Sequence, residues 1–490
     1  MPTSQMHSPE STFVKPSEQS AAYTEERRRY WEEYARTATK WAPMRRYYQR
    51  RLAEIYKLSV PPGMRILELG CGNGELLAQL EPSQGYGIDL SAQLIAEAGA
   101  KFPGLHFEVA DAGTVQLEGE FDFVIYSDLL NDLWDVQTVF ERIAGHCHPG
   151  TRFLINCYSR LWEGPRRVAE ALGLAKPQLS LNWLTVEDIT NLLTLGGFEV
   201  IRTSAEIMCP VKIPLIKTIC NRYLVKIWPF RWLGLTNFIV ARPIPTFGPS
   251  PEPLVTVVVP ARNEAGNIPA ILDRMPSLGA GTELIFVEGN SSDGTYERIE
   301  QEIAARPGCT ATLYKQTGRG KGDAVRLGFE KATGDLLMIL DADLTVPPED
   351  LPRFYEAWRT GRGEFINGVR LVYPMEEKAM RFFNLIGNKF FSLAFTWLLS
   401  QSVKDSLCGT KVLSRAHYQV IAANRAYFGE IDPFGDFDLL FGAARYNLKI
   451  LGLPVRYRER KYGETNIQRW KHGVVLLRMM MLASRRIRFV

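Results

Sequence analysis

A short stretch rich in proline and glycine, residues 243–253, most constrains how this chain can fold. It reads Pro-Ile-Pro-Thr-Phe-Gly-Pro-Ser-Pro-Glu-Pro. Proline fixes φ and lacks a backbone N–H, so this stretch cannot continue a helix or a central strand. Apolar, strand-like runs lie on either side, at residues 236–241 and 254–259. The pattern predicts a semi-rigid linker between two separately folded halves of a 490-residue chain.

Each half alternates short apolar runs with longer helical patterns. Such alternation is typical of βαβ units on a mostly parallel sheet. Hydrophobic residues make up 46% of the chain and charged residues 23%, so either half can bury its own core. The runs lie at residues 65–69, 85–89, 106–109, 121–126 and 152–156 in the first half, and at 254–259, 283–287, 310–314 and 336–340 in the second.

Charge and cysteine content exclude several classes of protein. The net charge of +4 is small for this length and gives no reason to expect nucleic acid as a partner. Seven scattered cysteines, none in a Cys-x-x-Cys pair, indicate a reduced, cytoplasmic protein. Residues 1–24 begin with a polar stretch without the apolar run of a signal peptide, and we expect a disordered tail there.

The chain has no uninterrupted apolar run of the ~20 residues that a membrane span needs. The nearest is residues 379–399, which is broken by four polar or charged residues. We therefore expect an interfacial or core helix there. The interrupting residues are Arg381, Asn384, Asn388 and Lys389.

The first half contains a glycine-rich turn directly after a predicted strand. Residues 66–74 read Ile-Leu-Glu-Leu-Gly-Cys-Gly-Asn-Gly. Glycines are needed where the backbone turns sharply and approaches a ligand closely. The next strand ends at Asp89, which can accept hydrogen bonds from a ribose, and the third is followed by Asp111, which can meet an adenine amine. A ligand site is expected at these strand ends, with Glu68 beside the turn.

On these residues the first half resembles a class I S-adenosylmethionine-dependent methyltransferase. The resemblance implies a Rossmann-like domain over residues 25–242 with S-adenosylmethionine as its cofactor. It implies that the glycine-rich loop holds the methionine part, Asp89 the ribose and Asp111 the adenine. A degenerate domain that binds nothing is the alternative. The implied cofactor-binding residues are Glu68, Gly70, Gly72, Gly74, Asp89 and Asp111.

These motifs do not identify the methyl acceptor. In such domains the residues after the fourth strand face the substrate, where an acidic group can orient or deprotonate a hydroxyl. A solvated loop with a helix cap is the alternative. Residues 211–235 mix basic and aromatic side chains, which suits either an anionic membrane surface or a substrate lid or inter-domain helix. The acceptor-site candidates are Ser127, Asp128, Asn131, Asp132, Trp134, Tyr158, Arg160 and Trp162.

The second half opens with a buried strand that ends at Pro260, and two more strand-turn-helix segments follow. After the apolar run 336–340 comes Asp341-Ala-Asp343. Two carboxylates at one strand end suit a hard divalent cation such as Mg²⁺ or Mn²⁺, which can bridge a diphosphate and neutralise a leaving group. Alone, such a pair is often only a solvated strand end.

With the three segments together, residues 254–490 resemble a family 2 glycosyltransferase. More narrowly they resemble the polyprenyl-phosphate group, which includes dolichol-phosphate mannose synthase and dolichyl-phosphate glucosyltransferase. The expected fold class is α/β, with two domains: a Rossmann-like class I methyltransferase followed by a GT-A nucleotide-sugar-binding domain. The resemblance implies a UDP- or GDP-hexose donor, with Asp341 and Asp343 holding the metal. The implied donor-binding residues are Pro260, Arg262, Asn263, Glu264, Glu288, Lys321 and Asp341.

Two positions depart from the pattern of that family. The second motif usually reads Val-Asp-Asp, whereas Glu288-Gly289-Asn290 stand in this chain, which leaves the donor nucleotide open. Many relatives have a glutamine as a further metal contact where this chain has Thr345.

The acceptor is implied by later residues. Gly368-Val-Arg370 resembles a Gly-Ser-Arg motif, and Arg381 lies on the next predicted helix. In the polyprenyl-phosphate enzymes, arginines in these places bind the acceptor phosphate, which suits the planar fork of a guanidinium. Surface residues or structural ion pairs are the alternative.

Three further segments support the narrower resemblance. Residues 405–411 and 458–467 resemble stretches of the glucosyl-transferring relatives, and the second of them can cover the donor site. Ordinary loop structure is the alternative for both segments. The C-terminal tail is basic and apolar, and with the 379–399 helix it predicts peripheral contact with the cytoplasmic face of a membrane.

We expect direct displacement at the anomeric carbon with inversion. A lipid phosphate is already charged at neutral pH, so it needs alignment and charge neutralisation rather than a strong base. A hydroxyl acceptor is the alternative, and it needs a base, either Asp436 or Asp438. In a third reading, one half is only a binding module. The expected catalytic residues are Asp343, Arg370, Arg381 and Asp438.

Overall fold

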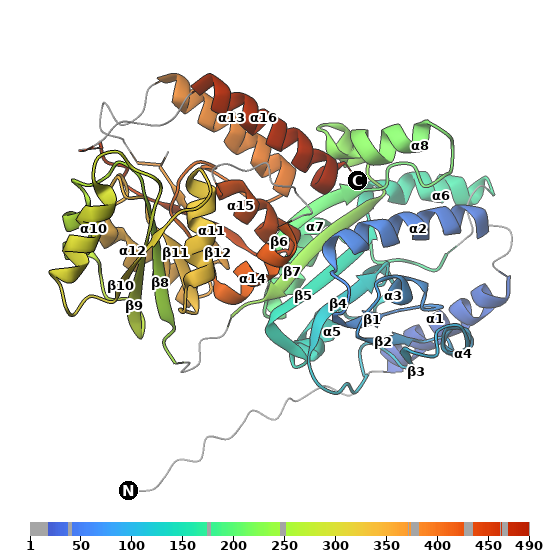
Figure 1. The fold of residues 1–490 in the computed structure, drawn as a ribbon. Helices are drawn as coiled ribbons and strands as arrows, with labels where there is room; N and C mark the ends of the chain where they lie inside the picture. Colours follow the sequence, from blue (N-terminus) through green and yellow to red (C-terminus); the bar gives the residue numbers. More distant parts are fainter. Residues whose placement is uncertain are drawn as a thin grey trace, which may run out of the picture.

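Two mixed β-sheets, one in each half of the chain, form the framework of the protein (Figure 1). The structure is a computed structural model, and each sheet has seven strands among the residues that it describes. The expected fold class, two α/β domains in sequence, is confirmed. The described residues are 18–37, 42–173, 178–245, 251–370, 372–373, 382–425, 435–460, 462 and 469–489.

The first sheet has the strand order β3-β2-β1-β4-β5-β7-β6. Its pairings are parallel except those of β7, which runs antiparallel to β5 and β6. The strands are β1 (Arg65–Leu69), β2 (Gln84–Asp89), β3 (His106–Val109), β4 (Phe121–Ser127), β5 (Cys147–Tyr158), β6 (Phe198–Glu206) and β7 (Thr236–Pro243). The helices are α1 (Glu18–Thr37), α2 (Ala42–Ser59), α3 (Glu75–Gln79), α4 (Ala92–Lys101), α5 (Val136–Ala144), α6 (Glu163–Ala171) and α7 (Val186–Leu195).

Helices cover both faces of this sheet because successive side chains of a strand point to opposite faces. Leu67 and Leu69 of β1 share one apolar cluster with α5 and α7. Ile66 shares the opposite cluster with α2 and α3. The segment between β6 and β7 forms short helical turns instead of a tight hairpin. They are α8 (Ile216–Thr218), η3 (Ile219–Tyr223), η4 (Leu224–Lys226) and η5 (Phe230–Leu233).

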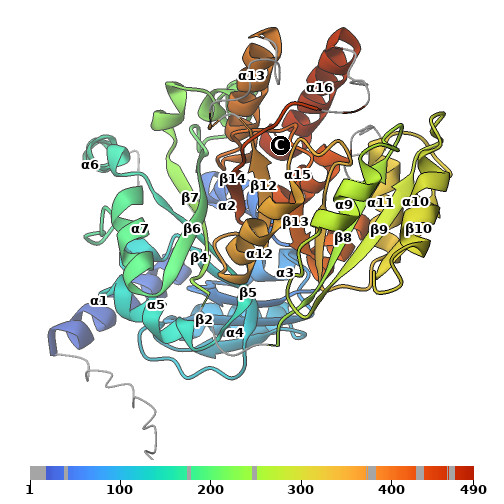
Figure 2. The ribbon, with the colours of Figure 1, turned by 90° about the vertical axis from the view of Figure 1, so that its left-hand side faces the viewer.

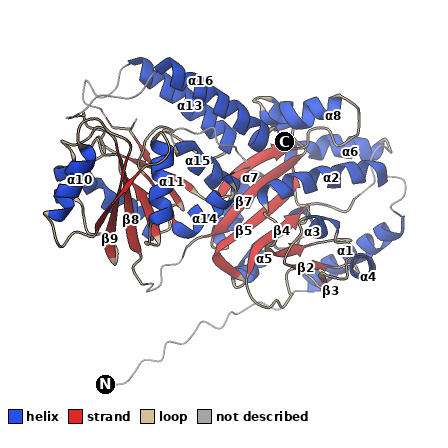
Figure 3. Ribbon diagram, in the orientation of Figure 1, coloured by secondary structure: helices blue, strands red, loops and turns tan. Residues whose placement is uncertain are grey.

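The second sheet has the strand order β10-β9-β8-β11-β13-β12-β14, and only β13 runs antiparallel to its neighbours. Figure 3 shows the strands of both halves in red and their helices in blue. The strands are β8 (Leu254–Ala261), β9 (Gly281–Glu288), β10 (Ala311–Lys315), β11 (Leu336–Ile339), β12 (Phe365–Val369), β13 (Lys411–Ser414) and β14 (Ile450–Pro454). The helices are α9 (Ile268–Arg274), α10 (Thr295–Ala304), α11 (Lys321–Lys331), α12 (Leu351–Arg359), α13 (Phe382–Leu399), α14 (Arg415–Ala423), α15 (Asp436–Arg445) and α16 (Arg469–Ala483), with a last turn η8 (Ser484–Arg488).

The α13 helix occupies the place expected for an interfacial or core helix. Phe395 is fully buried against α15, while Leu393 is 73% exposed. Among the described residues, no helix combines the length and apolar character needed to cross a bilayer. Figures 1 and 2 show α13 and α16 projecting on the same side of the molecule.

Helix α1 begins at Glu18, so the disordered tail expected over residues 1–24 is too long. Thr24 Oγ1 donates a hydrogen bond to Asp111 Oδ2 over 3.2 Å, and the buried Arg27 donates from Nη2 to the Ser180 carbonyl over 2.5 Å. The polar composition of this stretch is typical of disorder. Tertiary contacts of α1 with the first domain outweigh that preference, and composition alone does not reveal them.

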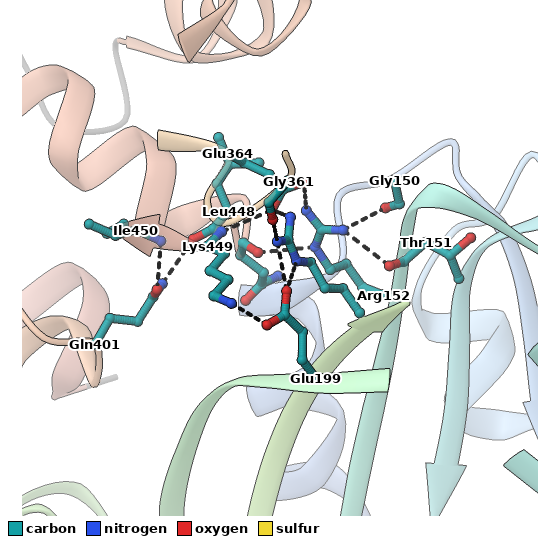
Figure 4. A network of polar contacts seen from close by, with 12 residues as sticks. Gly150, Thr151, Arg152, Glu199, Gly361, Glu364, Gln401, Leu448, Lys449 and Ile450 are labelled. Atoms are coloured by element: carbon teal, nitrogen blue, oxygen red, sulfur yellow. Dashed lines mark hydrogen bonds and ion pairs between the residues drawn. The ribbon is translucent and has the colours of Figure 1, made fainter. Parts of the chain in front are cut away.

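The two halves are joined by a buried polar network (Figure 4). Arg152 Nη2 lies 2.7 Å from Glu364 Oε1, and Arg242 Nη1 lies 3.1 Å from Glu364 Oε2. Glu199 of β6 pairs with Arg242 and with Lys449, which lies just before β14. The predicted linker falls between β7 and β8, so contacts across the two sheets supplement this covalent connection.

Candidate active sites

The glycine-rich turn after β1 forms an open cradle. Gly70, Gly72 and Gly74 have φ values of 71°, 56° and 72°, in the left-handed region that favours glycine. A Cβ at Gly74 would lie 2.6 Å from the ring of Phe107, so a side chain there would displace β3. A Cβ at Gly72 would meet nothing within 4 Å, which leaves room for a ligand against the loop.

The three acids expected to bind a cofactor lie around this cradle. Glu68 is 2% exposed, burial raises its pKa to about 8, and its Oε2 has no hydrogen-bond partner among the described residues. Asp89 accepts hydrogen bonds from the backbone N–H of Gly72 and of Ser91, each over 2.9 Å. Asp111 accepts one from Gly113 N over 2.8 Å and is the residue that Thr24 of α1 contacts. Asp89 therefore shapes the loop as well as lining it.

Asp128 lies at the end of β4 in a strained, half-buried position. Its φ is 55°, which is uncommon outside glycine. Tyr48 Oη donates to Asp128 Oδ1 over 2.9 Å, and Asn156 Nδ2 donates to the same oxygen over 2.5 Å. Burial raises the pKa of Asp128 to about 7, although both hydrogen bonds oppose the rise. The sequence pointed to Asp128 but not to Tyr48 or Asn156, because they come from α2 and β5.

Three of the other acceptor-site candidates, Asn131, Asp132 and Trp162, make side-chain hydrogen bonds within the protein. The Asn131 side chain donates to the Asn182 carbonyl over 2.6 Å and accepts from Tyr158 N. Asp132 accepts from Trp31 Nε1 of α1 over 3.1 Å. Trp162 Nε1 donates a hydrogen bond to the Leu233 carbonyl. Ser127 is the last residue of β4, and the side chains of Trp134 and Arg160 are exposed, Trp134 by 50%.

In the second domain, the first acid of the Asp-x-Asp pair lies against a lysine. Lys321 Nζ, at the start of α11, is 2.5 Å from Asp341 Oδ1. Burial opposes ionisation of Asp341, but the charge of Lys321 holds its pKa below the ordinary value. Gly409 lies directly on this pair, and a Cβ there would overlap both Asp341 Oδ2 and Lys321 Nζ. This packing explains the glycine in the 405–411 stretch.

The second acid lies against an arginine from the C-terminal segment. Arg460 Nη2 is 2.7 Å from Asp343 Oδ2, and its Nη1 is 3.2 Å from Glu264 Oε1. Asp343 Oδ1 accepts hydrogen bonds from the backbone and the hydroxyl of Thr345 over 3.1 and 2.7 Å. Burial raises the pKa of Glu264 to about 7, and the charge of Asp343 adds to the rise. The sequence indicated that residues 458–467 could cover the donor site, but it did not reveal the contact of Arg460 with Asp343 and Glu264.

This donor set fits a hard cation. Asp341 and Asp343 offer carboxylate oxygens at one strand end, and Lys321 and Arg460 show that positive charge is stable there. Within the described residues, no group of three His, Cys, Asp or Glu side chains is arranged to hold a metal by itself. Asp341 and Asp343 would hold such a cation together with water or a bound diphosphate, which would supply the remaining oxygen ligands.

The remaining donor-site residues shape the turns around the pair. Asn263, with φ 57°, accepts a hydrogen bond from Ser292 N over 2.9 Å, and the buried Glu288 accepts one from Ser291 N. Tyr462 packs over Gly266, where a Cβ would lie 2.5 Å from its ring. Pro260 is half-buried at the end of β8, and Arg262 is exposed beside it.

Arg370 is held in a bidentate ion pair. Its Nε and Nη2 donate to the two oxygens of Asp405 over 2.7 and 2.9 Å, and the guanidinium lies 5.2 Å from the Tyr457 ring. Burial opposes its charge, yet Asp405 raises the pKa of Arg370 above its ordinary value. The ion pair that the sequence left as an alternative is therefore present. Arg381 lies outside the described residues.

Of the two acids that begin α15, Asp436 lies nearer the Asp-x-Asp pair. Asp436 Oδ1 is 2.9 Å from Lys411 Nζ, and the charge of Lys411 also lowers the pKa of Asp341. Asp438 instead pairs with Arg326 and, over 3.5 Å, with Arg425.

A family model matches part of each half of the chain. A methyltransferase domain model matches residues 41–203, and the glycosyl transferase family 2 model matches residues 256–420. Among curated proteins, the undecaprenyl-phosphate 4-deoxy-4-formamido-L-arabinose transferase of Aeromonas hydrophila is 38% identical over 112 residues, 22% of this chain and 34% of that protein. The same enzyme of Edwardsiella ictaluri is 27% identical over 228 residues, 46% of this chain and 64% of that protein. Dolichol-phosphate mannosyltransferase of Saccharomyces cerevisiae is 38% identical over 108 residues, 21% of this chain and 40% of that protein.

Solved structures resemble the two halves separately. Magnesium protoporphyrin IX methyltransferase from Synechocystis, with bound SAH, has a TM-score of 0.33 at 18% identity and covers 45% of this chain and 99% of its own. Glucosyl-3-phosphoglycerate synthase from Mycobacterium tuberculosis, with Mn²⁺, UDP and phosphoglyceric acid, has a TM-score of 0.36 at 18% identity. The match covers 48% of this chain and 78% of the synthase chain. On the two family models, the chain combines a methyltransferase domain with a domain of glycosyl transferase family 2.

Proposed function

We propose that the C-terminal half transfers a hexose from a UDP- or GDP-sugar to a polyprenyl phosphate, with inversion. The observation that carries this proposal is the strand end at Asp341 and Asp343, which already accommodates two cations, Lys321 and Arg460. Such a centre suits a diphosphate bridged to the protein by positive charge. The similarity to enzymes named for undecaprenyl phosphate and dolichol phosphate supports a lipid phosphate as acceptor.

Asp341 and Asp343 would hold Mg²⁺ or Mn²⁺, which offsets the charge developing on a leaving diphosphate. Lys321 then donates to the diphosphate, because its ammonium lies at the same point. Arg460 and Tyr462 cover the donor side of the site and exclude water from the sugar.

Asp405 fixes Arg370 in one orientation and leaves its Nη1 edge to meet an acceptor phosphate. Arg381 is the second arginine that we assign to this phosphate. A hydroxyl acceptor would need a base instead, and Asp436 is then the nearer carboxylate, because Asp438 is engaged by Arg326.

For the N-terminal half we propose methyl transfer from S-adenosylmethionine to a hydroxyl of a glycan or lipid. Bound in the cradle of Gly70, Gly72 and Gly74, the cofactor would supply an activated methyl group. Its ammonium would satisfy the orphaned Glu68 Oε2. Asp128 acts as the base, since a carboxyl with a pKa of about 7 can take a proton from a hydroxyl near neutral pH. Tyr48 and Asn156 hold it in position.

We further propose peripheral attachment to the cytoplasmic face of a membrane. Large apolar side chains are exposed on the 211–235 segment and on α13, including Leu215 at 73%, Trp228 at 66% and Leu393 at 73%. Basic residues of the same segment flank them, a composition that favours an anionic bilayer surface. All seven cysteines are free, which agrees with a reducing compartment.

A transfer assay tests the glycosyl reaction directly. Purified protein with Mg²⁺ or Mn²⁺ is offered UDP- and GDP-hexoses with a short polyprenyl phosphate, and lipid-linked sugar is followed by mass spectrometry. We expect product that disappears in Asp343→Ala and persists in Asp335→Ala, whose side chain is 64% exposed. Binding of nucleotide-sugar without lipid product from any donor would refute the lipid-phosphate acceptor and favour a hydroxyl.

A further inference from the structure

A pocket outside both active sites opens between the two halves of the chain. The first half supplies walls from α2, β6, η4 and β7, and the second half from α13, α15 and η8. The pocket opens to solvent, and its cavity volume is about 60 Å³. Its position at a junction of two domains is typical of ligand sites.

The lining of this pocket, which we call the junction pocket, carries a strong excess of positive charge. The lining holds six cationic side chains and a single carboxylate, Glu206, which pairs with Lys226, while Arg51 pairs with Glu54 outside the lining over 2.7 Å. The cationic residues are Arg51, Arg202 and Lys226 from the first half and Arg445, Arg486 and Arg488 from the second.

Two of the arginines make their hydrogen bonds to neutral groups. Arg202 donates to Asn447 Oδ1 over 2.9 and 3.1 Å, and to Ser59 Oγ over 2.9 Å. Arg488 donates to Ser400 Oγ over 2.5 Å and packs 5.3 Å from the Trp397 ring. Its buried Nε has no hydrogen-bond partner among the described residues. Polar atoms buried in this way normally find a partner, so this Nε offers an unused donor beside the pocket.

The cations of the junction pocket also disfavour one another's charge. Burial lowers the pKa of Lys226 to about 8 in spite of Glu206, and the charges of Arg488 and Arg51 contribute to the shift. Burial likewise lowers the pKa of Arg202 to about 10, with contributions from Arg488 and Arg445. An anion in the pocket would relieve this repulsion.

We propose that the junction pocket binds a phosphate group. A guanidinium fork matches phosphate oxygens, and arginines reach this pocket from both domains. The other walls are apolar, which suits the phosphate of a lipid as well as a free phosphate ion. They include Ile55, Leu58, Phe238, Val240, Leu399 and Ile487.

Phosphate binding there would strengthen the contact between the domains. Arg202 belongs to β6 and Arg488 to η8, so one anion can neutralise charge on both sides of the junction. The proposal is independent of the reactions assigned above, because the junction pocket shares no lining residue with the Asp-x-Asp pair or the glycine-rich turn.

The test measures binding to the full chain with UDP present to saturate the donor site. Inorganic phosphate and farnesyl phosphate are titrated by calorimetry, and the midpoint of thermal unfolding is followed in parallel. We expect binding by the wild type, a rise in the midpoint, and a loss of roughly tenfold in affinity for Arg488→Gln and Arg202→Gln, since each removes one charge-assisted contact. Arg359→Gln, which removes an exposed charge on α12, is the control and retains wild-type affinity.

The two ligands separate the sources of the phosphate. Binding of farnesyl phosphate that is tighter than that of inorganic phosphate and weakens in Arg488→Gln identifies a lipid as the occupant. Binding of the two ligands that is equally tight and weakens in Arg488→Gln identifies the free ion. Wild-type protein that binds neither ligand at millimolar concentration overturns the proposal. So does Arg488→Gln that is as stable as the wild type without ligand and binds with unchanged affinity, because the ligand then lies elsewhere.

Discussion

Replacing Glu364 by glutamine tests whether the two domains are held together by their buried ion pairs. Glutamine keeps the shape of the side chain and removes its charge. Glu364 faces Arg152 over 2.7 Å and Arg242 over 3.1 Å, and the side chains of these arginines are only 4% and 2% exposed. It also accepts a hydrogen bond from Lys449 N over 2.9 Å. The substitution thus leaves two buried guanidiniums with one carboxylate fewer.

The expected cost follows from what each arginine retains. Removing one partner of a buried pair costs about 3–5 kcal/mol, because the remaining charge stays desolvated. Arg242 keeps Glu199 at 2.7 Å, whereas Arg152 keeps only carbonyl oxygens, those of Gly150, Thr151 and Asn447. The loss therefore falls mainly on Arg152, and we expect the lower end, about 3 kcal/mol.

Calorimetric thermal unfolding of the full chain measures this loss. For domains of this size we expect the transition that reports the junction to fall by roughly 6–12 °C. Glu356→Gln is the matched control, because its pair with Arg359 is about half exposed and should contribute less than about 1 kcal/mol. Equal shifts in the two variants would refute the reasoning.

The pH dependence gives the experiment a second readout. Burial opposes ionisation of Glu364, but Arg152 and Arg242 hold its pKa below the ordinary value. A group whose pKa is lowered by folding stabilises the protein above its unfolded pKa of about 4.3, and the contribution is lost as the pH falls through the folded pKa. The difference between wild type and Glu364→Gln should therefore be full at neutral pH and shrink in acid.

Three further predictions concern the active sites. Asp128→Asn should lower the rate of methyl transfer by at least about 100-fold. The wild-type rate should rise through about pH 7, because Asp128 loses its proton there, and an unchanged pH–rate profile in the variant would contradict its role as base. Gly409→Ala should abolish glycosyl transfer and spare methyl transfer, because the added Cβ would overlap Asp341 and Lys321. Both reactions are assayed on one preparation, and loss of both would indicate misfolding instead. Arg460→Ala should raise KM for the nucleotide-sugar about tenfold with little change in kcat, as expected for a group that closes over the donor. A fall in kcat alone would contradict this role, because it would show that Arg460 acts in the chemical step and not in donor binding.

Much of the architecture follows from local patterns in the sequence. The apolar runs predicted at residues 65–69 and 106–109 coincide with β1 and β3, because strand formation there depends on a short run between glycine- or polar-rich turns. The glycine-rich turn was visible for the same reason, since a left-handed φ at three alternate positions selects glycine. The Asp-x-Asp pair follows its strand directly, so its place needed no tertiary information.

The partners of these residues were decided only by the tertiary structure. Asp128 depends on Tyr48, which lies 80 positions earlier, and Asp343 depends on Arg460, which lies 117 positions later. Arg370 shows that a motif does not reveal the partner of its side chain. The motif suits a phosphate site, whereas the side chain pairs with Asp405. The first residues of helix α1, 18–24, lie in the segment predicted to be disordered, but the helix contacts Asp111 and Ser180.

The sequence by itself determined two α/β domains and the residue types at each strand end. It did not determine that the halves share a buried network through Arg152 and Glu364, or that six cations meet in the junction pocket. The physical reason is that a strand or a turn is set by residues within a few positions of one another. A salt bridge or a pocket is set by the packing of whole domains, and local sequence patterns carry no record of that packing.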